Sequence, residues 1–280
     1  MRESYKRSEL AKLKDEFGFN YSKSLGQNFL TDRNIIENIA DALELSGQEN
    51  VVEIGAGAGA MTTVLSERAG EVFAIEIDRR MIPVLENVTE GLSNVRILNE
   101  DFLKIDGGSL PHKYKLVGNL PYYITTPIIA KVLEDPLIPM PEQMVFMMQK
   151  EVGERLMSPS GKKSYGAISV LVQYYCEVSK VCSVPRTVFV PSPNVDSIVL
   201  SFVPKKGLSD DADVVRQMFA IVKAGFSMRR KTLRNSLASL GLSEEVLLSA
   251  LSSADISPER RAETLSPDDF LRLAKEISAK

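Results

Sequence analysis

Histidine, cysteine and tryptophan are scarce in this sequence. Its 280 residues include one histidine, two cysteines and no tryptophan. The single histidine, His112, argues against a histidine-containing catalytic triad and against a cluster of histidine metal ligands. Cys176 and Cys182 are spaced neither as a CxxC redox pair nor as half of a zinc site, so we interpret them as reduced thiols. The sequence therefore predicts chemistry that requires neither histidine nor a metal.

Long hydrophobic runs are also missing. No uninterrupted apolar span reaches the length of a membrane helix, and the apolar fraction of 44% and charged fraction of 25% are ordinary for a soluble globular protein. The N-terminal stretch MRESYKRSELAKLKDEFGF lacks the apolar core and cleavage site of a secretory signal. We therefore expect a cytoplasmic protein with no membrane partner, and nothing in the sequence demands more than a monomer.

Acidic residues are absent from one long interval. The whole chain has a net charge of -3, yet no Asp or Glu occurs between Val214 and Ser243. A solvated helix face is one interpretation of this interval, and contact with an anionic partner such as RNA is the other. The candidate contacts to RNA phosphates are Lys223, Arg229, Arg230, Lys231 and Arg234.

The first part of the chain alternates β-rich runs with helical patterns. Strands are expected at residues 50–54, 71–77, 95–98, 115–118, 144–148, 177–183 and 197–203. Helices are expected at residues 61–69, 79–89, 126–134, 150–157 and 167–175, and a further helix is expected to start at the N-cap Asp32. This alternation predicts an α/β fold with a parallel sheet and helices on both faces.

The composition changes at VPKKGLSDDAD, residues 203–213, where Pro, Gly, Ser and acidic residues indicate a linker. Beyond it the pattern is helical, and Ser266 followed by Pro267 is typical of a helix start. We therefore expect two domains, a sheet domain at residues 1–205 and a small all-helical domain at residues 206–280.

The glycine-rich stretch VVEIGAGAGAM, residues 51–61, fits two cofactors. Gly55 and Gly57 lie in a turn between the first strand and first helix of the sheet, where backbone approaches a ligand. Glu76 ends the second strand, and its carboxylate can accept hydrogen bonds from both hydroxyls of an adenosine ribose. Both NAD and S-adenosylmethionine (SAM) carry that ribose, so these residues do not separate a nicotinamide site from a SAM site.

The third strand favours SAM. Asp101 follows this strand, where it can accept a hydrogen bond from the adenine amine, and Phe102 can flank the ring. Glu53 is an acid near the end of a buried strand, where dinucleotide turns usually stay apolar and SAM sites often have an acid. A helix N-cap is the structural alternative for an acid at a strand end.

The fourth strand ends in KLVGNLPYYIT, and its Asn119, Leu120, Pro121 and Tyr122 face the same crevice as the glycine turn. A β-turn followed by core aromatics is the plain interpretation. The combination also suits methylation of an adenine amine, whose lone pair is delocalised into the ring. The Asn side-chain carbonyl and a backbone carbonyl of the Leu-Pro segment can each accept an amine hydrogen, while Tyr122 offers a face for stacking.

These motifs together resemble the small-subunit ribosomal RNA adenine dimethyltransferases (KsgA/RsmA). The resemblance covers nearly the whole chain and implies a Rossmann-like class I SAM-dependent methyltransferase fold, with a seven-stranded, mostly parallel sheet and a helical C-terminal domain that binds rRNA. The matching segments, in the family's order, are SLGQNFL, EIGAGAGAMT, AIEID, EDFL, GNLPYYIT, VPRTVFVPSPNVDSIVL, FSMRRKTLRNSL and RAETLSPDDFLRLA.

The resemblance assigns roles to individual residues. It implies a SAM site formed by Asn28, Leu30, Gly55, Gly57, Glu76, Ile77, Asp101, Phe102 and Asn119. It implies a catalytic group of Asn119, Leu120, Pro121, Tyr122 and Phe189, with Phe189 and Tyr122 on opposite faces of the target adenine; an ordinary core aromatic is the alternative for Phe189. Tyr123 and Met228 depart from the residues that the family pattern leads us to expect.

The family's activity is transfer of two methyl groups to each of two adjacent adenosines, in a hairpin near the 3′ end of small-subunit (16S) rRNA, during subunit maturation. The small ribosomal subunit is therefore the expected partner. Three alternatives stay open: a large-subunit rRNA adenine methyltransferase of the macrolide-resistance type, an assembly factor that binds the immature subunit, and an NAD-dependent oxidoreductase. The last leaves NLPY and the basic interval unexplained.

Overall fold

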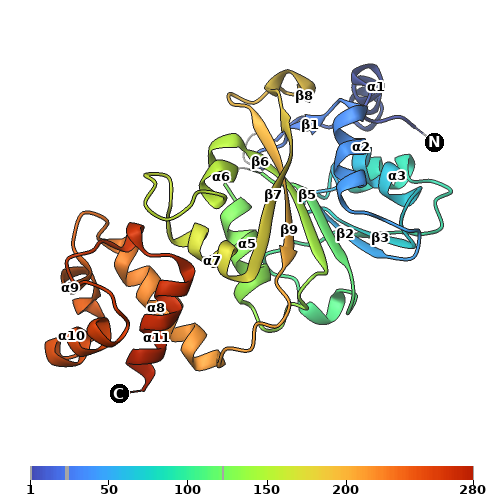
Figure 1. Ribbon diagram of the computed structural model, residues 1–280. Coiled ribbons are helices and arrows are strands. Elements are labelled where there is room, and N and C mark those ends of the chain that lie inside the picture. The colour runs from blue at the N-terminus through green and yellow to red at the C-terminus, as the bar shows by residue number, and fades with distance from the viewer. Residues whose placement is uncertain (1, 23–24, 122, 280) are drawn as a thin grey trace. The chain divides into compact units, whose positions relative to one another are not determined.

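A computed structural model describes residues 2–22, 25–121 and 123–279, and its elements are drawn in Figure 1. The main sheet has seven strands in the order β4-β3-β2-β5-β6-β9-β7. Their bounds are β2 Asn50–Ile54, β3 Glu71–Ile75, β4 Val95–Leu98, β5 Lys115–Asn119, β6 Gln143–Gln149, β7 Cys176–Val184 and β9 Ser197–Pro204. All seven strands predicted from the sequence are therefore confirmed, with ends that differ by at most two residues.

Strand direction makes the sheet mostly parallel. Strands β4, β3, β2, β5 and β6 pair in parallel, whereas β9 pairs with β6 in the antiparallel direction. The central strands are apolar along almost their whole length, as expected for strands that are covered on both faces. Parallel pairing brings the carboxyl ends of β2, β3, β4 and β5 to one edge of the sheet, which is where ligands of such folds bind.

A second, two-stranded sheet joins β1 (Phe29–Leu30) to β8 (Phe189–Val190) in the antiparallel direction. The sequence did not predict these strands, because runs of two residues have no periodicity to detect. Thr31 extends the contact, since its backbone N–H and its side-chain hydroxyl both donate to the Val188 carbonyl at 2.8 Å. The pairing places the N-terminal segment beside a stretch more than 150 residues later in the chain.

The helices are α1 Arg7–Phe17, α2 Arg33–Ala42, α3 Ala60–Ser66, α4 Ile82–Val88, α5 Thr125–Glu134, α6 Lys150–Leu156, α7 Ala167–Tyr175, α8 Ala212–Ser227, α9 Leu233–Ser236, α10 Glu244–Ser253 and α11 Pro267–Ser278. The predicted N-caps are confirmed. Asp32 accepts from the backbone N–H groups of Asn34 and Ile35, and Ser266 forms a capping box with Asp269. Helix α1 was not predicted.

The chain divides into two compact units. The first consists of residues 1–153 and 178–204 and contains both sheets, and the second consists of residues 154–177 and 205–280. The boundary near residue 205 agrees with the linker in the sequence, but the helical unit also takes in residues 154–177. The reason lies in its core, where Tyr165, Val170 and Tyr174 pack with apolar residues of α8 and α11.

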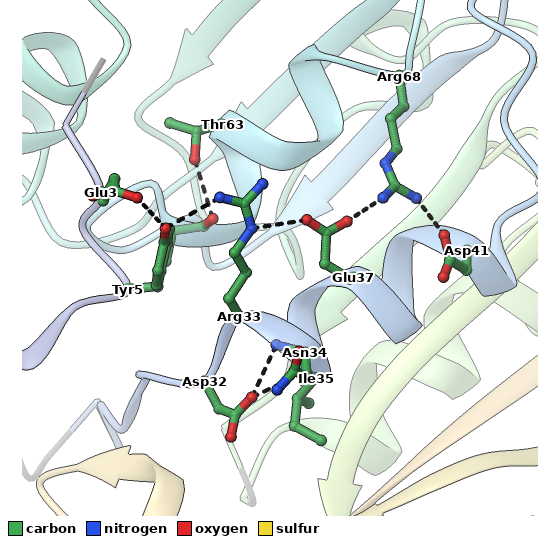
Figure 2. A network of polar contacts seen from close by, with 11 residues as sticks. Glu3, Tyr5, Asp32, Arg33, Asn34, Ile35, Glu37, Asp41, Thr63 and Arg68 are labelled. Carbon is green, nitrogen blue, oxygen red and sulfur yellow. Dashed lines mark hydrogen bonds and ion pairs between the residues drawn. The ribbon is translucent and has the colours of Figure 1, made fainter.

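Figure 2 shows a polar network that joins the N-terminal segment, α2 and the segment that follows α3 within the first unit. Arg68 donates to both Glu37 and Asp41, and Glu37 accepts a further hydrogen bond from Arg33 at 3.0 Å. The Arg33 guanidinium also donates to the Tyr5 hydroxyl at 3.2 Å and lies over its ring. The network ties three segments together at the end of the chain that supplies β1.

Candidate functional site: a cavity at the carboxyl edge of the sheet

One cavity collects most of the residues singled out in the sequence. It lies at the carboxyl ends of β2, β3, β4 and β5, and the segment at residues 25–30 also contributes to its wall. The predicted residues that line it are Asn28, Leu30, Gly55, Gly57, Glu76, Ile77, Asp101, Phe102, Asn119, Leu120 and Pro121. Every residue predicted to contact SAM therefore lies in the wall of the same cavity.

The glycine turn lets the backbone form the cavity wall. Gly55 and Gly57 have φ values of +77° and +55°, a conformation that side chains with a Cβ rarely adopt. A Cβ on Gly57 would also lie 3.0 Å from the Phe29 ring, so a larger residue would require this ring to move by a few tenths of an ångström. The positive φ and the close approach explain why the turn requires glycine at this position.

Glu76 is held by the glycine turn and by the loop that follows β3. One carboxylate oxygen accepts from the Gly57 backbone N–H at 2.7 Å, and the other accepts from the Asp78 N–H at 2.8 Å. The side chain is buried, and this burial raises the pKa of Glu76. Because a carboxylate offers about four lone-pair sites over its two oxygens, Glu76 can still accept from a ligand.

The part of the cavity predicted to hold the cofactor adenine is formed after β3 and β4. Ile77 exposes 48% of its surface, which is unusual for isoleucine and leaves an apolar face toward the cavity that it lines. Asp101 accepts from the Leu103 N–H at 3.0 Å through one oxygen, and its other oxygen is 3.7 Å from the exposed Lys104 ammonium. Phe102 is buried and contributes to the same wall.

Glu53 lies under the glycine turn and lines the cavity, although it is almost completely buried. Its one recorded partner is the Thr62 hydroxyl, which donates at 2.6 Å. Burial raises the pKa of Glu53 to about 7, and the nearby Glu76 carboxylate adds to this effect. The helix that follows the turn is capped by Gly59, so Glu53 does not act as its N-cap.

Asn119 is held in one orientation by the N-terminal segment. Its side-chain Nδ2 donates to the Asn28 carbonyl at 2.9 Å, while the Asn28 side chain donates to the Gly26 carbonyl at 3.0 Å. A carbonyl can only accept, so this contact leaves Asn119 Oδ1 as the acceptor of the amide. Tyr122, predicted to stack on the target base, lies outside the described residues.

The backbone after Asn119 has its own partners. The Leu120 N–H donates to the Met147 carbonyl at 3.1 Å, which continues the pairing of β5 with β6. The Pro121 carbonyl accepts from the Ile124 N–H at 3.0 Å and from the Thr125 hydroxyl at 3.2 Å. The Pro121 carbonyl therefore already accepts hydrogen bonds from the start of helix α5. The Leu120 carbonyl is the candidate in this segment for a ligand contact.

Gln27 was missed by the sequence analysis. Its Nε2 donates to the buried Asp78 carboxylate at 2.9 Å, and its Oε1 accepts from the Ser22 N–H at 2.8 Å. Hydrogen bonds from Arg80 lower the pKa of Asp78, which keeps it ionised as an acceptor. Gln27 therefore attaches the N-terminal segment to the loop that carries Glu76. The signal in the sequence was its place in SLGQNFL, beside residues that were assigned to the cofactor.

Phe189 is not among the residues that line the cavity. It is 2% exposed and packs in the core of the first unit with Leu30, its partner in the two-stranded sheet. This is the packing expected of a core aromatic, so contact between Phe189 and a target base stays a prediction. Tyr123, one of the departures from the family pattern, is 58% exposed, and its ring lies close to Gly26.

The five predicted RNA contacts differ in their surroundings. All five side chains belong to exposed residues of the helical unit. Arg229 donates to the carbonyls of Lys163 and Tyr165 and is 3.4 Å from Glu263, and Arg234 forms an ion pair with Glu244. Among the described residues, Lys223, Arg230 and Lys231 form no recorded ion pair. Met228, the other departure from the family pattern, lies exposed in the same turn.

The described residues offer neither a metal-binding cluster nor a membrane-spanning helix. No group of three or more His, Cys, Asp or Glu side chains is arranged to hold a metal ion in residues 2–22, 25–121 and 123–279. No helix in the same residues is long and apolar enough to cross a membrane.

Comparison with known proteins decides the family. The model of the family described as "Ribosomal RNA adenine dimethylase" matches residues 18–279. The chain belongs to the ribosomal RNA adenine dimethylase family. The predicted family and the predicted class of enzyme, an rRNA adenine methyltransferase, are therefore confirmed. The oxidoreductase alternative is excluded, because the glycine turn belongs to a methyltransferase.

Individual relatives agree with this membership. "Ribosomal RNA small subunit methyltransferase A" of Staphylococcus haemolyticus is 45% identical over 275 residues, which cover 94% of this chain and 92% of that protein. The protein of the same name from Staphylococcus aureus (strain bovine RF122 / ET3-1) is 46% identical over 280 residues, covering 96% and 94%.

Two solved structures share the fold. A dimethyladenosine transferase from Plasmodium falciparum has a TM-score of 0.77 and 28% identity, and the match covers 90% of this chain and 98% of that one. The 23S rRNA methyltransferase ErmE has a TM-score of 0.69 and 27% identity, covering 90% and 100%. The predicted Rossmann-like methyltransferase fold is confirmed. Identity to the two small-subunit methyltransferases exceeds identity to ErmE.

Proposed function

We propose that this protein dimethylates the exocyclic N6 amines of two adjacent adenosines in a hairpin near the 3′ end of small-subunit (16S) rRNA, in ribosome biogenesis, with SAM as cofactor. The observation that carries the proposal is the placement of Asn119 in the wall of the same cavity as the glycine turn and Glu76. The small-subunit target is supported by the 45% and 46% identity to proteins named for the small subunit.

The cavity fits SAM on the chemistry of its wall. The Glu76 oxygens can each accept from a ribose hydroxyl, since a carboxylate offers about four lone-pair sites over its two oxygens. Ile77 and Phe102 offer apolar surface for the adenine, and Asp101 can accept from the adenine amine. The amino-acid end of the cofactor would be enclosed by Gly55, Gly57 and the segment that contains Asn28 and Leu30. When bound, the cofactor supplies an electrophilic methyl group.

The described residues can orient the target amine. Because Asn28 holds Nδ2 of Asn119, Oδ1 of Asn119 is available to accept one amine hydrogen, and the Leu120 carbonyl can accept the other. With both hydrogens held, the nitrogen lone pair is directed toward the methyl group, and this alignment is the main source of rate enhancement. No general base is required before attack, because the neutral amine becomes acidic only after it gains the methyl group.

The base and the RNA need further contacts. We propose that Tyr122 and Phe189 contact the two faces of the target adenine, which must leave its stack to enter the cavity. Since Phe189 is buried, its ring or the base must shift for this contact to form. Lys223, Arg229, Arg230, Lys231 and Arg234 would bind phosphates of the rRNA. We propose that the protein works in the cytoplasm, as a monomer, on the small ribosomal subunit.

The test is incubation with labelled SAM and either small or large ribosomal subunits that lack their adenine methylations, followed by identification of the nucleosides by mass spectrometry. We expect dimethyladenosine from small subunits only. The Asn119→Ala variant should abolish it. Asn50→Ala is the matched control, because Asn50 lies at the start of β2 and donates to the Lys113 carbonyl, and it is not part of the cavity wall.

The other outcomes identify the alternatives. Product from large subunits only would assign the protein to the macrolide-resistance type. Tight binding to small subunits without any methylated product would support the assembly factor, and in that case Glu76→Ala should still bind the subunits.

A further inference from the structure

A second basic segment lies beside the predicted RNA-contacting turn of the helical unit, and the sequence analysis did not include it. The two segments are the 158–165 loop, with sequence SPSGKKSY, and the 227–234 turn, with sequence SMRRKTLR. Arg229 joins them, since its Nη2 donates to the Lys163 carbonyl at 2.8 Å and to the Tyr165 carbonyl at 3.3 Å. The loop that carries Lys162 and Lys163 is therefore in direct contact with the turn, through the Arg229 side chain.

The loop is held in place at several points along its backbone. The Gly161 N–H donates to the Glu263 carbonyl at 2.7 Å, and the hydroxyls of Ser158 and Ser164 bond at 2.8 Å. Tyr165 is fully buried in the core of the helical unit, where its ring lies edge to face with Phe226 at 5.9 Å. The backbone that carries the two lysines is thus ordered before any partner binds, which lowers the entropic cost of binding.

The charges on the loop and the turn have one sign. The two segments contain six cationic residues and no acid: Lys162, Lys163, Arg229, Arg230, Lys231 and Arg234. Acids from outside pair with two of them, Glu263 with Arg229 and Glu244 with Arg234. The remaining four are exposed and, within the described part of the chain, have no recorded ion pair. The surface therefore keeps an excess of four positive charges over two segments joined by Arg229.

We propose that Lys162 and Lys163 extend the RNA-contacting surface of the 227–234 turn and bind phosphates of the rRNA backbone. This inference rests on the proposed function, because that function makes RNA the partner. Besides its proposed phosphate contact, Arg229 holds the loop beside the turn, since its Nη2 donates to the loop carbonyls and lies 3.4 Å from Glu263. Lysine ammonium groups act as point charges for phosphates without base specificity, so the loop adds affinity and leaves the choice of adenosine to the cavity.

The test compares two lysine pairs of the helical unit. Lys162→Ala/Lys163→Ala removes two charges from the loop, and Lys205→Ala/Lys206→Ala removes two exposed charges from the linker as a matched control. The control keeps the backbone hydrogen bond from Lys205 to the Tyr175 carbonyl and loses the one from Lys205 Nζ to the Gln173 carbonyl, so its folding is checked by urea unfolding. Binding to unmethylated small subunits is measured at several KCl concentrations and constant Mg²⁺, and the slope of log K against log salt is compared.

We expect the loop variant to reduce the magnitude of this negative slope by roughly 1.4 to 1.8, because each of the two phosphate contacts contributes about 0.7 to 0.9. The control should keep the wild-type slope, and Lys162→Arg/Lys163→Arg should keep it as well. An unchanged slope in the alanine loop variant would overturn the assignment, as would equal losses in both alanine variants or no measurable binding by the wild-type protein.

Methylation is scored separately, by the mass spectrometry described above. A wild-type protein that yields no dimethyladenosine but shows the expected loss of slope in the loop variant would overturn the proposed activity and keep the loop assignment. If the protein forms dimethyladenosine and the loop variant keeps the wild-type slope, the proposed activity stands and the loop assignment is overturned.

Discussion

Glu53 should make the stability of this protein depend on pH near neutrality. Its carboxyl is almost completely buried and has the Thr62 hydroxyl as its recorded donor, at 2.6 Å. Burial raises the pKa of Glu53 in the folded protein to about 7, whereas the ordinary value is 4.5. The folded state therefore holds this proton more tightly than the unfolded chain does.

The sign and size of the effect follow from these two pKa values. Below pH 4.5 the carboxyl is protonated in both states and imposes no penalty. As pH rises from 4.5 to 7, the unfolded chain loses the proton first, so the free energy of unfolding falls. At about 1.4 kcal/mol for each pKa unit, the total loss is about 3 kcal/mol above pH 7, and most of it falls between pH 5 and pH 8.

Glu53→Gln removes the titration and keeps the size of the side chain, and its carbonyl can still accept from Thr62. We expect the variant to gain about 2–3 kcal/mol relative to wild type between pH 5 and pH 8. The assay is urea unfolding of both proteins, without SAM, at pH 5, 6.5 and 8. A difference between the two proteins that stays constant over this range would refute the assigned burial and pKa of Glu53.

Glu49→Gln is the control, because Glu49 precedes the same strand and its pKa is shifted in the opposite direction. Hydrogen bonds from the Ser46 hydroxyl and N–H lower the pKa of Glu49 to about 2. The stability that this carboxylate contributes is present above pH 4.5 and is lost only as pH falls toward 2. Between pH 5 and pH 8, Glu49→Gln should therefore lower stability by an amount that does not change with pH.

Three further substitutions test the cavity. Asn119→Asp cannot donate to the Asn28 carbonyl, so the single-turnover rate of methyl transfer should fall about 100-fold or more; an active variant would contradict the proposed orientation. Gln27→Ala removes the contact to Asp78 and should weaken SAM binding about fivefold to tenfold by calorimetry, with little change in stability. Gly57→Ala places a Cβ 3.0 Å from a ring at a φ of +55° and should cost about 1–2 kcal/mol in urea unfolding; wild-type stability would contradict the reason given for glycine.

The sequence by itself determined the sheet and most of the cavity. Alternating β-rich and helical patterns predicted all seven strands of the main sheet, because the strands are rich in apolar and β-branched residues and the central ones are buried on both faces. Once these strands are parallel neighbours, their carboxyl ends meet at one edge. The residues after each strand, Gly55, Glu76, Asp101 and Asn119, therefore line one cavity, and local order along the chain was enough to bring them together.

The tertiary structure alone decided how these residues are held. The pairing of β1 with β8, the bond from Asn119 to the Asn28 carbonyl and the contact of Gln27 with Asp78 all join segments more than 50 residues apart. No periodicity encodes such contacts, because they depend on how the packed elements approach one another.

The same reason explains what the sequence could not decide about charge and burial. The sequence motif implied that Phe189 contacts the target base, whereas in the structure its pairing with Leu30 buries it in the core. Composition alone suggested that Arg229 and Arg234 are available for a partner. In the structure, Arg229 pairs with Glu263 and Arg234 pairs with Glu244 of α10. Arg229 also contacts the 158–165 loop, which is distant in sequence. Composition determines which charges the chain carries, whereas packing decides which of them are neutralised and which stay exposed to a partner.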